Sequence, residues 1–437
     1  MKIPTKRLSY EQAMSRKKPK HRKPLRPMRL LQWIVRILSG ASLKRVNFKC
    51  RKHRMDKLGK KEPCLILMNH SGFVDMQIAS KIFFPKRYGI VCTEDSFVGF
   101  GKPLLMRLLG CIPTKKFTSD VQLIKDMRYM LKKKRCSILM YPEASYSFDG
   151  TATPLPRKMG VLLKRLDVPV VTVITKGAFA RDPLYNCLQK RKVNVSADAT
   201  YLLTVQEIRT KTVSELDQIL DEAFSFDNFD WQQRSRTVID EPFRADGLNR
   251  ILYRCPHCGK EGKTMGKGVT LTCRNCGYAY ELTETGWLKC LSGNAAFTHI
   301  PNWYAWERGQ VRHELEKGTY RMRADVDIGV MVDYKAIYMV GKGTLIHDTD
   351  GFRLTGCNGK LNYVQGPLAS YSLYSDYYWY EIGDVICIGN RDVQYYCFPQ
   401  NCGDVVAKTR LATEELYKLK KSRPMEEDGY VQETFFV

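Results

Sequence analysis

A histidine followed five residues later by an aspartate is the first feature of the sequence that could carry chemistry. The motif N-H-S-G-F-V-D at residues 69–75 directly follows the short apolar segment 65–68, which is typical of a buried strand. If the chain turns back at the end of this strand, the Asp75 carboxylate can accept a hydrogen bond from one imidazole nitrogen of His70. That bond would fix the tautomer and make the other nitrogen a stronger general base. On its own the spacing is weak evidence, because a lone histidine is more often a turn or core residue.

Further polar and basic residues accompany other apolar segments of the same region. Segments 111–114, 137–141 and 168–174 are strand-like, and helical patterns lie between them. Active groups of α/β proteins lie where loops leave the carboxyl ends of strands. The candidate side chains, two of which begin a helical pattern, are Lys115, Lys116, Glu143, Ser145, Arg157 and Lys158.

Taken in order, four blocks of this region resemble the glycerophospholipid acyltransferase family, typified by 1-acylglycerol-3-phosphate acyltransferases. That family carries Asn-His-x4-Asp, Gly-x-Ile ending in a basic residue, Phe-Pro-Glu-Gly-Thr-Arg-Ser and Val-Pro-Ile-Val-Pro. The corresponding blocks here are N-H-S-G-F-V-D at 69–75, G-C-I-P-T-K-K at 110–116, Y-P-E-A-S-Y-S at 141–147 and V-P-V-V-T at 168–172. The resemblance covers roughly residues 45–225, and the order of the four blocks makes it specific.

The resemblance implies roles for these residues. His70 would deprotonate the acceptor hydroxyl of a lysophospholipid, and Asp75 would orient His70. The hydroxyl oxygen would then attack the thioester of an acyl donor, either acyl-CoA or an acyl-carrier protein. An anionic acceptor needs fixed cations close to the base. The acceptor pocket would contain Glu143 and Ser145, and the acceptor phosphate would be held by Lys115 or Lys116 together with Lys158 and Arg157.

Three departures from the family pattern bear on the acceptor. Tyr146 stands where the family usually has arginine, Lys115 and Lys116 replace arginine in the second block, and Thr172 stands where proline is common. A lysine supplies a point charge but not the bidentate clamp of a guanidinium. One alternative is therefore an acyltransferase for an amino- or glyco-lysolipid. A second alternative is a catalytically inactive zinc-ribbon protein that binds or regulates at a membrane or on nucleic acid.

Two C-x2-C pairs form a second strong signal. C-P-H-C at 255–258 and C-R-N-C at 273–276 are separated by 14 residues. Four thiolates at this spacing are typical of a closed tetrahedral zinc site, which stabilises a small ribbon and leaves no open position for catalysis. His257 is not expected to bind the metal. The predicted zinc ligands are Cys255, Cys258, Cys273 and Cys276.

Positive charge is concentrated at the N-terminus. The 437-residue chain has a formal net charge of +26, and residues 1–61 hold 21 basic side chains against two acids. This distribution excludes a uniformly basic, histone-like protein. Residues 28–43 have the broad apolar face of a helix that lies on anionic lipid, although such a helix could instead cover the next domain's core. Nucleic acid is not the expected partner, because no aromatic residues interleaved with arginine follow the arm.

The sequence predicts a cytoplasmic protein that binds peripherally to the cytoplasmic face of a membrane. It has no run of 18 or more apolar residues, and Gln32 and Arg36 interrupt its early apolar run, unlike a secretory signal. The 15 cysteines are odd in number and many lie in apolar segments, which indicates reduced thiols.

Alternating strand-like and helical segments predict an α/β domain with a mixed, largely parallel sheet flanked by helices. A zinc ribbon and a small β-rich C-terminal domain are expected after it, and the order of strands and a final helix in the latter is like that of a pleckstrin-homology barrel. The expected divisions are a disordered basic arm at 1–24, an amphipathic membrane-surface helix region at 25–61, the acyltransferase domain at 62–225, a linker at 226–250, the zinc ribbon at 251–285 and the β-rich domain at 286–437.

Overall fold

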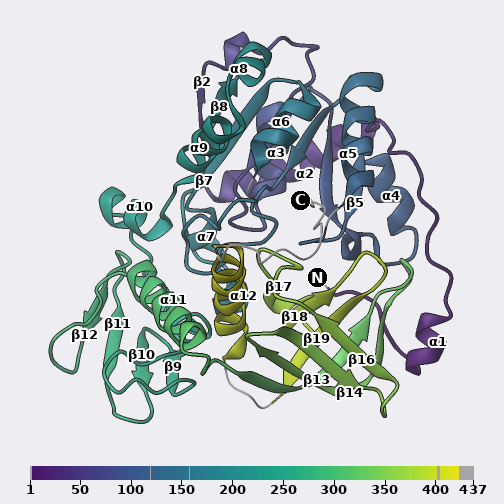
Figure 1. The fold of residues 1–437 in the computed structure, drawn as a ribbon. Coiled ribbons are helices and arrows are strands. Elements are labelled where there is room, and N and C mark those ends of the chain that lie inside the picture. Colours follow the sequence, from purple (N-terminus) through teal and green to yellow (C-terminus); the bar gives the residue numbers. More distant parts are fainter. Residues whose placement is uncertain (1, 119, 157, 401–403, 423–437) are drawn as a thin grey trace. The chain divides into compact units, whose positions relative to one another are not determined.

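The computed structural model describes residues 2–118, 120–156, 158–400 and 404–422. The chain divides into two compact units. The α/β unit comprises residues 20–182 and 190–228, and the β-rich unit comprises residues 1–19, 183–189 and 229–436. Figure 1 shows the helices and strands of both units.

A seven-stranded sheet forms the centre of the α/β unit, in the order β2-β8-β7-β3-β6-β4-β5. Among the described residues, β7 and β8 pair antiparallel and the other neighbours pair parallel. The mixed α/β class is thus confirmed, and the pair β7–β8 departs from the parallel pattern. The strands are β2 (Lys49–His53), β3 (Leu65–Met68), β4 (Tyr88–Thr93), β5 (Cys111–Thr114), β6 (Ser137–Met140), β7 (Val170–Lys176) and β8 (Ser196–Leu203).

Helices connect these strands and cover both faces of the sheet. Two of them begin with capping boxes, in which Thr204 pairs with Glu207 and Thr212 pairs with Glu215, so that each satisfies backbone N–H groups of the first turn. The helices are α2 (Arg29–Arg45), α3 (Asp75–Phe83), α4 (Lys102–Leu108), α5 (Val121–Arg128) continued by a π-helical turn (Tyr129–Lys133), α6 (Met159–Leu166), α7 (Ala178–Arg181), α8 (Val205–Thr210) and α9 (Val213–Phe224), with short helical turns at Met55–Lys57 and Glu94–Phe97.

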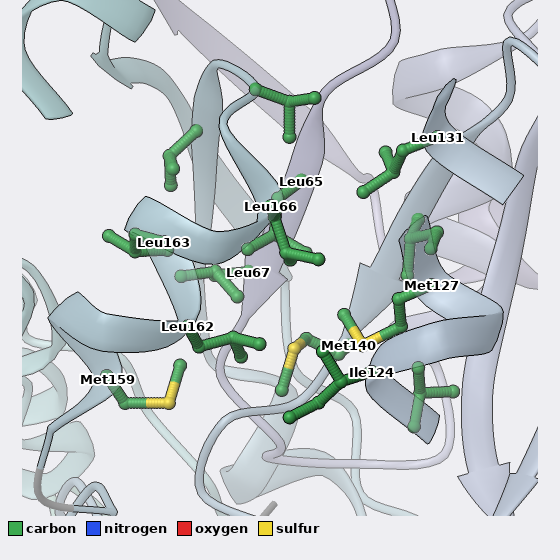
Figure 2. Close-up of a cluster of buried hydrophobic side chains, with 14 of the residues drawn as sticks. Leu65, Leu67, Ile124, Met127, Leu131, Met140, Met159, Leu162, Leu163 and Leu166 are labelled. Carbon is green, nitrogen blue, oxygen red and sulfur yellow. The ribbon is translucent and has the colours of Figure 1, made fainter. Parts of the chain in front are cut away.

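Strand β3 is buried on both faces, which positions the loop that follows it. Leu65 and Leu67 pack among the side chains of α5 and α6 (Figure 2), and Ile66 and Met68 pack on the other face with α3 and the end of α2. Burying each such side chain contributes roughly 2 kcal/mol. Because β3 and β6 are parallel neighbours, their carboxyl ends lie at the same edge of the sheet. The loops that follow them can therefore meet there.

The β-rich unit contains a four-stranded antiparallel sheet in the order β12-β11-β10-β9. One cysteine pair precedes β9, and the other lies at the end of β10 and just after it. Its strands are β9 (Thr264–Lys267), β10 (Thr270–Cys273), β11 (Ala279–Leu282) and β12 (Leu288–Cys290). The flanking helices are α10 (Asn228–Ser235) and α11 (Ile300–Glu316), with helical turns at Leu184–Asn186 and Leu248–Arg250.

A larger sheet of the same unit has the antiparallel order β16-β15-β14-β13-β19-β18-β17, and β1 (Thr5–Arg7) pairs parallel with β14. Helix α12 (Val405–Ser422) follows the last strand, and its residues 409–416 are all buried. The order of strands and helix is the one expected above for a pleckstrin-homology-like barrel, and that identity stays a prediction. The strands are β13 (Met322–Val330), β14 (Ile337–Asp348), β15 (Gly351–Gly356), β16 (Leu361–Gln365), β17 (Tyr374–Trp379), β18 (Gly383–Gly389) and β19 (Gln394–Gln400).

The N-terminal residues differ from the expected disordered arm. Strand β1 (Thr5–Arg7) pairs with β14, and α1 (Tyr10–Met14) begins at a capping box of Ser9. The Arg16 guanidinium binds the Asp333 carboxylate at 2.8 Å. The basic, polar composition of this segment predicts disorder. The strand edge and the carboxylate that order it lie more than 300 residues away, where local composition cannot reveal them.

Two other expected divisions differ from the structure. Residues 49–53, placed in the membrane-surface helix region, form the edge strand β2, and α10 lies within the expected linker at 226–250. The zinc ribbon and the C-terminal strands fall into one compact unit. No helix in the described part of the chain is both long enough and apolar enough to cross a membrane.

Candidate active site

The predicted chemical residues lie on two loops at one edge of the central sheet. His70 follows β3, and the loop of residues 142–147 follows the neighbouring strand β6. The Ser147 backbone N–H donates a hydrogen bond of 3.2 Å to the His70 carbonyl oxygen. This bond joins the two loops, which are more than 70 residues apart in the sequence.

His70 and Asp75 meet as the sequence predicts. The distance from His70 Nδ1 to Asp75 Oδ2 is 3.1 Å. Asp75 is the first residue of α3, and its Oδ2 also accepts the backbone N–H groups of Ser71 at 2.9 Å and Gly72 at 3.1 Å. The carboxylate is therefore fixed by the turn and favoured by the helix N-terminus. An ionised Asp75 accepts the proton on Nδ1, which leaves Nε2 of His70 as the basic nitrogen.

Asn69 connects this loop to the opposite neighbour of β3. Its side-chain oxygen accepts hydrogen bonds from the Thr175 backbone N–H at 2.8 Å and hydroxyl at 3.0 Å. Its amide nitrogen donates to Ser71 Oγ at 2.8 Å. Asn69 thereby holds the first turn after β3 against β7. This contact helps to fix the backbone at His70, the next residue.

Burial changes the proton affinities of the pair. The His70 side chain is only 17% exposed, and burial, with a smaller effect from the Lys116 ammonium, holds the pKa of His70 well below its usual value. Burial raises the pKa of Asp75 to about 7, although the hydrogen bonds from Gly72 and Ser71 act in the opposite direction. Two interacting groups of this kind titrate as a unit. His70 is thus neutral at pH 7, as a general base must be.

Two tyrosines cover the faces of the imidazole ring. The Tyr141 ring lies 4.0 Å from the His70 ring on one side, and the Tyr146 ring lies 3.7 Å away on the other, measured between centroids. The corresponding interplanar angles are 21° and 28°. The residue that replaces the family's usual arginine, Tyr146, therefore lies in direct contact with the proposed base.

Glu143 and Ser145 lie on the same loop as Tyr146 and are both buried. Glu143 Oε2 accepts a long hydrogen bond of 3.4 Å from the Thr153 backbone N–H. Ala144, between them, has a left-handed φ of 55°, which an L-residue adopts at some cost. The loop thus turns sharply beside His70.

The predicted basic residues have different described neighbours. Lys116 acts on His70 electrostatically, and Lys115 Nζ lies 3.9 Å from Glu94 Oε2. Lys158 is the N-cap of α6, where its backbone N–H donates to Asp217 Oδ2 at 2.9 Å. Arg157 lies outside the described residues. Phosphate binding by these side chains stays a prediction.

One buried carboxylate beside the motif was not found from the sequence. Asp182 follows α7 and accepts a hydrogen bond of 2.6 Å from the Arg181 guanidinium. A Cβ atom on Gly72 would lie 2.9 Å from Asp182 Oδ1 and 2.7 Å from the Ala178 carbonyl oxygen, so only glycine fits there. Burial raises the pKa of Asp182 to about 7. No motif in the sequence indicates that Asp182, which follows a short helix, lies beside Gly72.

The four predicted zinc ligands converge in the β-rich unit. Their Sγ atoms all lie within 4.8 Å of one another. The distance is 3.7 Å between Cys255 and Cys276 and 3.8 Å between Cys258 and Cys273. Such separations match the edges of a tetrahedron of thiolates around zinc at a metal–sulfur distance of about 2.3 Å. The residues present therefore fit a structural zinc ion.

Comparison with known proteins agrees with the chemistry of the α/β unit. The family model described as Acyltransferase matches residues 49–176, which contain His70, Asp75 and the loop after β6. This part of the chain is an acyltransferase domain. Over these residues the chain is similar to the glycerophospholipid acyltransferases.

Two relatives are similar over parts of their length. The 1-acyl-sn-glycerol-3-phosphate acyltransferase BAT2, chloroplastic, of Brassica napus is 28% identical over 116 residues, which are 26% of this chain and 33% of that protein. The chain thus spans about a third of the length of this curated relative. The crystal structure of the 1-acyl-sn-glycerophosphate acyltransferase PlsC from Thermotoga maritima aligns with a TM-score of 0.35 and 13% identity, over 44% of this chain and 77% of PlsC.

Proposed function

We propose that the protein transfers a fatty acyl group from acyl-CoA or an acyl-carrier protein to the hydroxyl of a lysophospholipid similar to 1-acylglycerol-3-phosphate. The observation that carries this proposal is the His70–Asp75 pair, with its 3.1 Å contact, at the start of a domain that the acyltransferase model matches. Such a reaction serves phospholipid synthesis or remodelling.

The reaction needs one base and no covalent enzyme intermediate. His70 Nε2 takes the proton of the acceptor hydroxyl while its oxygen bonds to the thioester carbonyl carbon of the donor. The carbon–sulfur bond then breaks, and the departing thiolate receives the proton back from His70. Asp75 holds Nδ1 throughout and stabilises the imidazolium that forms between the two steps.

The acceptor is proposed to bind beside the loop after β6. Glu143 and Ser145 would contact its glycerol end, and Lys116, which already acts on His70 electrostatically, would hold an anionic head group. Lys115, Arg157 and Lys158 would add positive charge. Tyr146 favours the second candidate, an amino- or glyco-lysolipid acceptor, because it occupies the place of the arginine that the family pattern provides.

A peripheral site on the cytoplasmic face of a membrane is proposed from helix α2. Five apolar side chains at helical spacing are between 37% and 69% exposed, namely Leu30, Trp33, Ile34, Ile37 and Leu38. Basic residues surround them in sequence, as anionic lipid binding requires. Flotation of the full chain with vesicles that contain phosphatidylglycerol, compared with phosphatidylcholine alone, should show binding that Trp33→Glu weakens. Equal recovery of both proteins would remove this part of the proposal.

Zinc is proposed as a structural ion bound by the four thiolates of Cys255, Cys258, Cys273 and Cys276. When bound, it stabilises the small sheet and supplies no chemistry to the acyl transfer. Chelation should therefore increase amide hydrogen exchange over residues 251–285 before it affects residues 62–225. Simultaneous loss of protection in both regions would contradict a separate structural role.

The experiment that tests the proposed activity is transfer from labelled acyl-CoA, and separately from labelled acyl-carrier protein, to a panel of lysolipids. The panel includes 1-acylglycerol-3-phosphate, a lysoaminolipid and a lysoglycolipid, and His70→Ala is assayed beside the wild type. A His70-dependent product establishes the enzyme and names the acceptor. No product with any pair of substrates would instead support a catalytically inactive binding protein.

A further inference from the structure

We propose that Tyr141 and Tyr146 are positioning residues that clamp the His70 imidazole between their rings and favour the imidazolium formed during acyl transfer. The clamp rests on the proposed function, because it acts through His70. Tyr146 then has its own role in the reaction at the position where the family pattern has arginine.

The clamp consists of near-parallel rings in face-to-face contact. Tyr141 and Tyr146 cover opposite faces of His70, at 4.0 and 3.7 Å. Phe73 extends the stack, with its ring 5.6 Å from that of Tyr146 at an angle of 18°. With both faces covered and Nδ1 bound to Asp75, the imidazole can rotate little. The remaining edge of the ring carries Nε2, which is the atom that must meet the acceptor hydroxyl.

The backbone explains how two tyrosines five residues apart reach both faces of one ring. Tyr141 directly follows β6, and its ring contacts that of His70. The chain then turns at Ala144, whose φ is left-handed. The hydrogen bond from the Ser147 N–H to the His70 carbonyl oxygen holds the later residues of the loop against the histidine. Tyr146 is thereby placed on the opposite face.

The stack interacts more strongly with a protonated ring than with a neutral one. A cation over the face of a tyrosine is attracted by the ring quadrupole, and the attraction grows when water is excluded. Asp75 and the two tyrosines favour the proton on His70, whereas burial and Lys116 oppose it. Because the imidazolium exists only after the acceptor has been deprotonated, this contact is gained on the way to the transition state and accelerates transfer.

The test compares two substitutions of Tyr146 in the full chain. Tyr146→Phe keeps the ring, whereas Tyr146→Leu keeps an apolar cover but removes the π face. We expect Tyr146→Leu to lower kcat about 3- to 30-fold, the range that a lost cation–π contact implies. We also expect the acid limb of its kcat/KM profile to move to lower pH, because a less favoured imidazolium loses its proton earlier. Tyr146→Phe should retain both properties.

A matched control separates this effect from general disruption of the unit. Tyr129→Leu removes a half-buried tyrosine of the α/β unit that lies outside the site, with the Lys23 and Lys134 ammonium groups each 5.5 Å from its ring centroid. It should leave kcat and the pH profile unchanged. If Tyr146→Leu does not fold, the comparison is repeated with Tyr146→Met, which has no aromatic ring, and Tyr146→Trp, which has one.

The outcomes distinguish the clamp from the activity on which it rests. Transfer that persists in His70→Ala would overturn the proposed function. Transfer that depends on His70 but is equal in the Leu and Phe variants would overturn the clamp alone. A lower kcat in Tyr146→Leu with an unmoved acid limb would also overturn it, since that result indicates a structural role without stabilisation of the imidazolium.

Discussion

Three buried carboxylates, Asp75 and Asp182 in the α/β unit and Glu414 in the β-rich unit, have contrasting environments. In the α/β unit, burial raises the pKa values of Asp75 and Asp182 to about 7. In the β-rich unit, burial also opposes the charge of Glu414, but the guanidinium groups of Arg308 and Arg410 outweigh it and hold the pKa of Glu414 below its usual value. The Arg308 guanidinium lies 2.7 Å from Glu414 Oε2 and 3.1 Å from Glu415 Oε1.

We infer that the charge of Asp75 serves the reaction, whereas the charge of Glu414 stabilises the structure. The ion pairs of Arg308 with Glu414 and Glu415 connect two helices, α11 and α12. Asp75 instead binds a histidine that must gain and lose a proton, and one of its oxygens, Oδ1, is buried with no hydrogen-bond partner among the described residues. Functional sites often retain groups that are unfavourable for folding. The predictions below test this contrast.

Asp75→Asn should have the largest effect, with opposite signs for activity and stability. Loss of the carboxylate that orients His70 should lower kcat at least about 100-fold. A folded-state pKa above the unfolded value means that Asp75 stabilises the fold below about pH 4 and that this contribution is lost as pH rises to about 7. At pH 8 the variant should therefore be more stable by up to about 4 kcal/mol in urea unfolding. A clear loss of stability would show that the charge is structural.

Arg308→Met should destabilise the protein by about 2–4 kcal/mol, because Glu414 and Glu415 are buried and lose a shared cation. Urea unfolding at pH 7 measures this directly. The matched control is Arg312→Met, whose guanidinium is 45% exposed and also contacts Glu415, and it should cost less than about 1 kcal/mol. Equal effects of the two substitutions would contradict the structural reading of the Arg308 pairs.

Asp182→Asn should have the smallest effect and should act through the His70–Asp75 pair. Removing a like charge near Asp75 lowers the pKa of that carboxyl, so the acid limb of kcat/KM should move down by about half a pH unit. The pH dependence of acyl transfer in the wild type and the variant measures this shift. An unchanged limb would show that Asp182 serves only to pair with Arg181.

The features that the sequence predicted correctly have local signals. The apolar segment 65–68 predicts β3, and the spacing of His70 and Asp75 fits a single turn at the start of a helix. The two C-x2-C pairs predict that their four thiolates lie together. Each depends on residues a few positions apart. The order of the four blocks then indicated a resemblance to a family, which the spacing of His70 and Asp75 alone could not do.

The features that were missed depend on residues far apart in the sequence. Strand β1 is ordered by β14, although its basic composition alone indicates disorder. The antiparallel pairing of β7 with β8 depends on the path of the intervening chain rather than on strand composition. Tyr146 could be noted as a departure from the family pattern, but its contact with His70 depends on a turn at Ala144 that no residue type predicts.

The central claim, that His70 is the base of an acyltransferase, is tested most directly by a time course of labelled acyl transfer. Wild type and His70→Ala are compared at pH 8 with equal protein, the acceptor found in the panel and a fold check by circular dichroism and zinc content. The account predicts product from the wild type and at least about a 1,000-fold slower reaction from the folded, zinc-containing variant. Equal rates from the two proteins would contradict it.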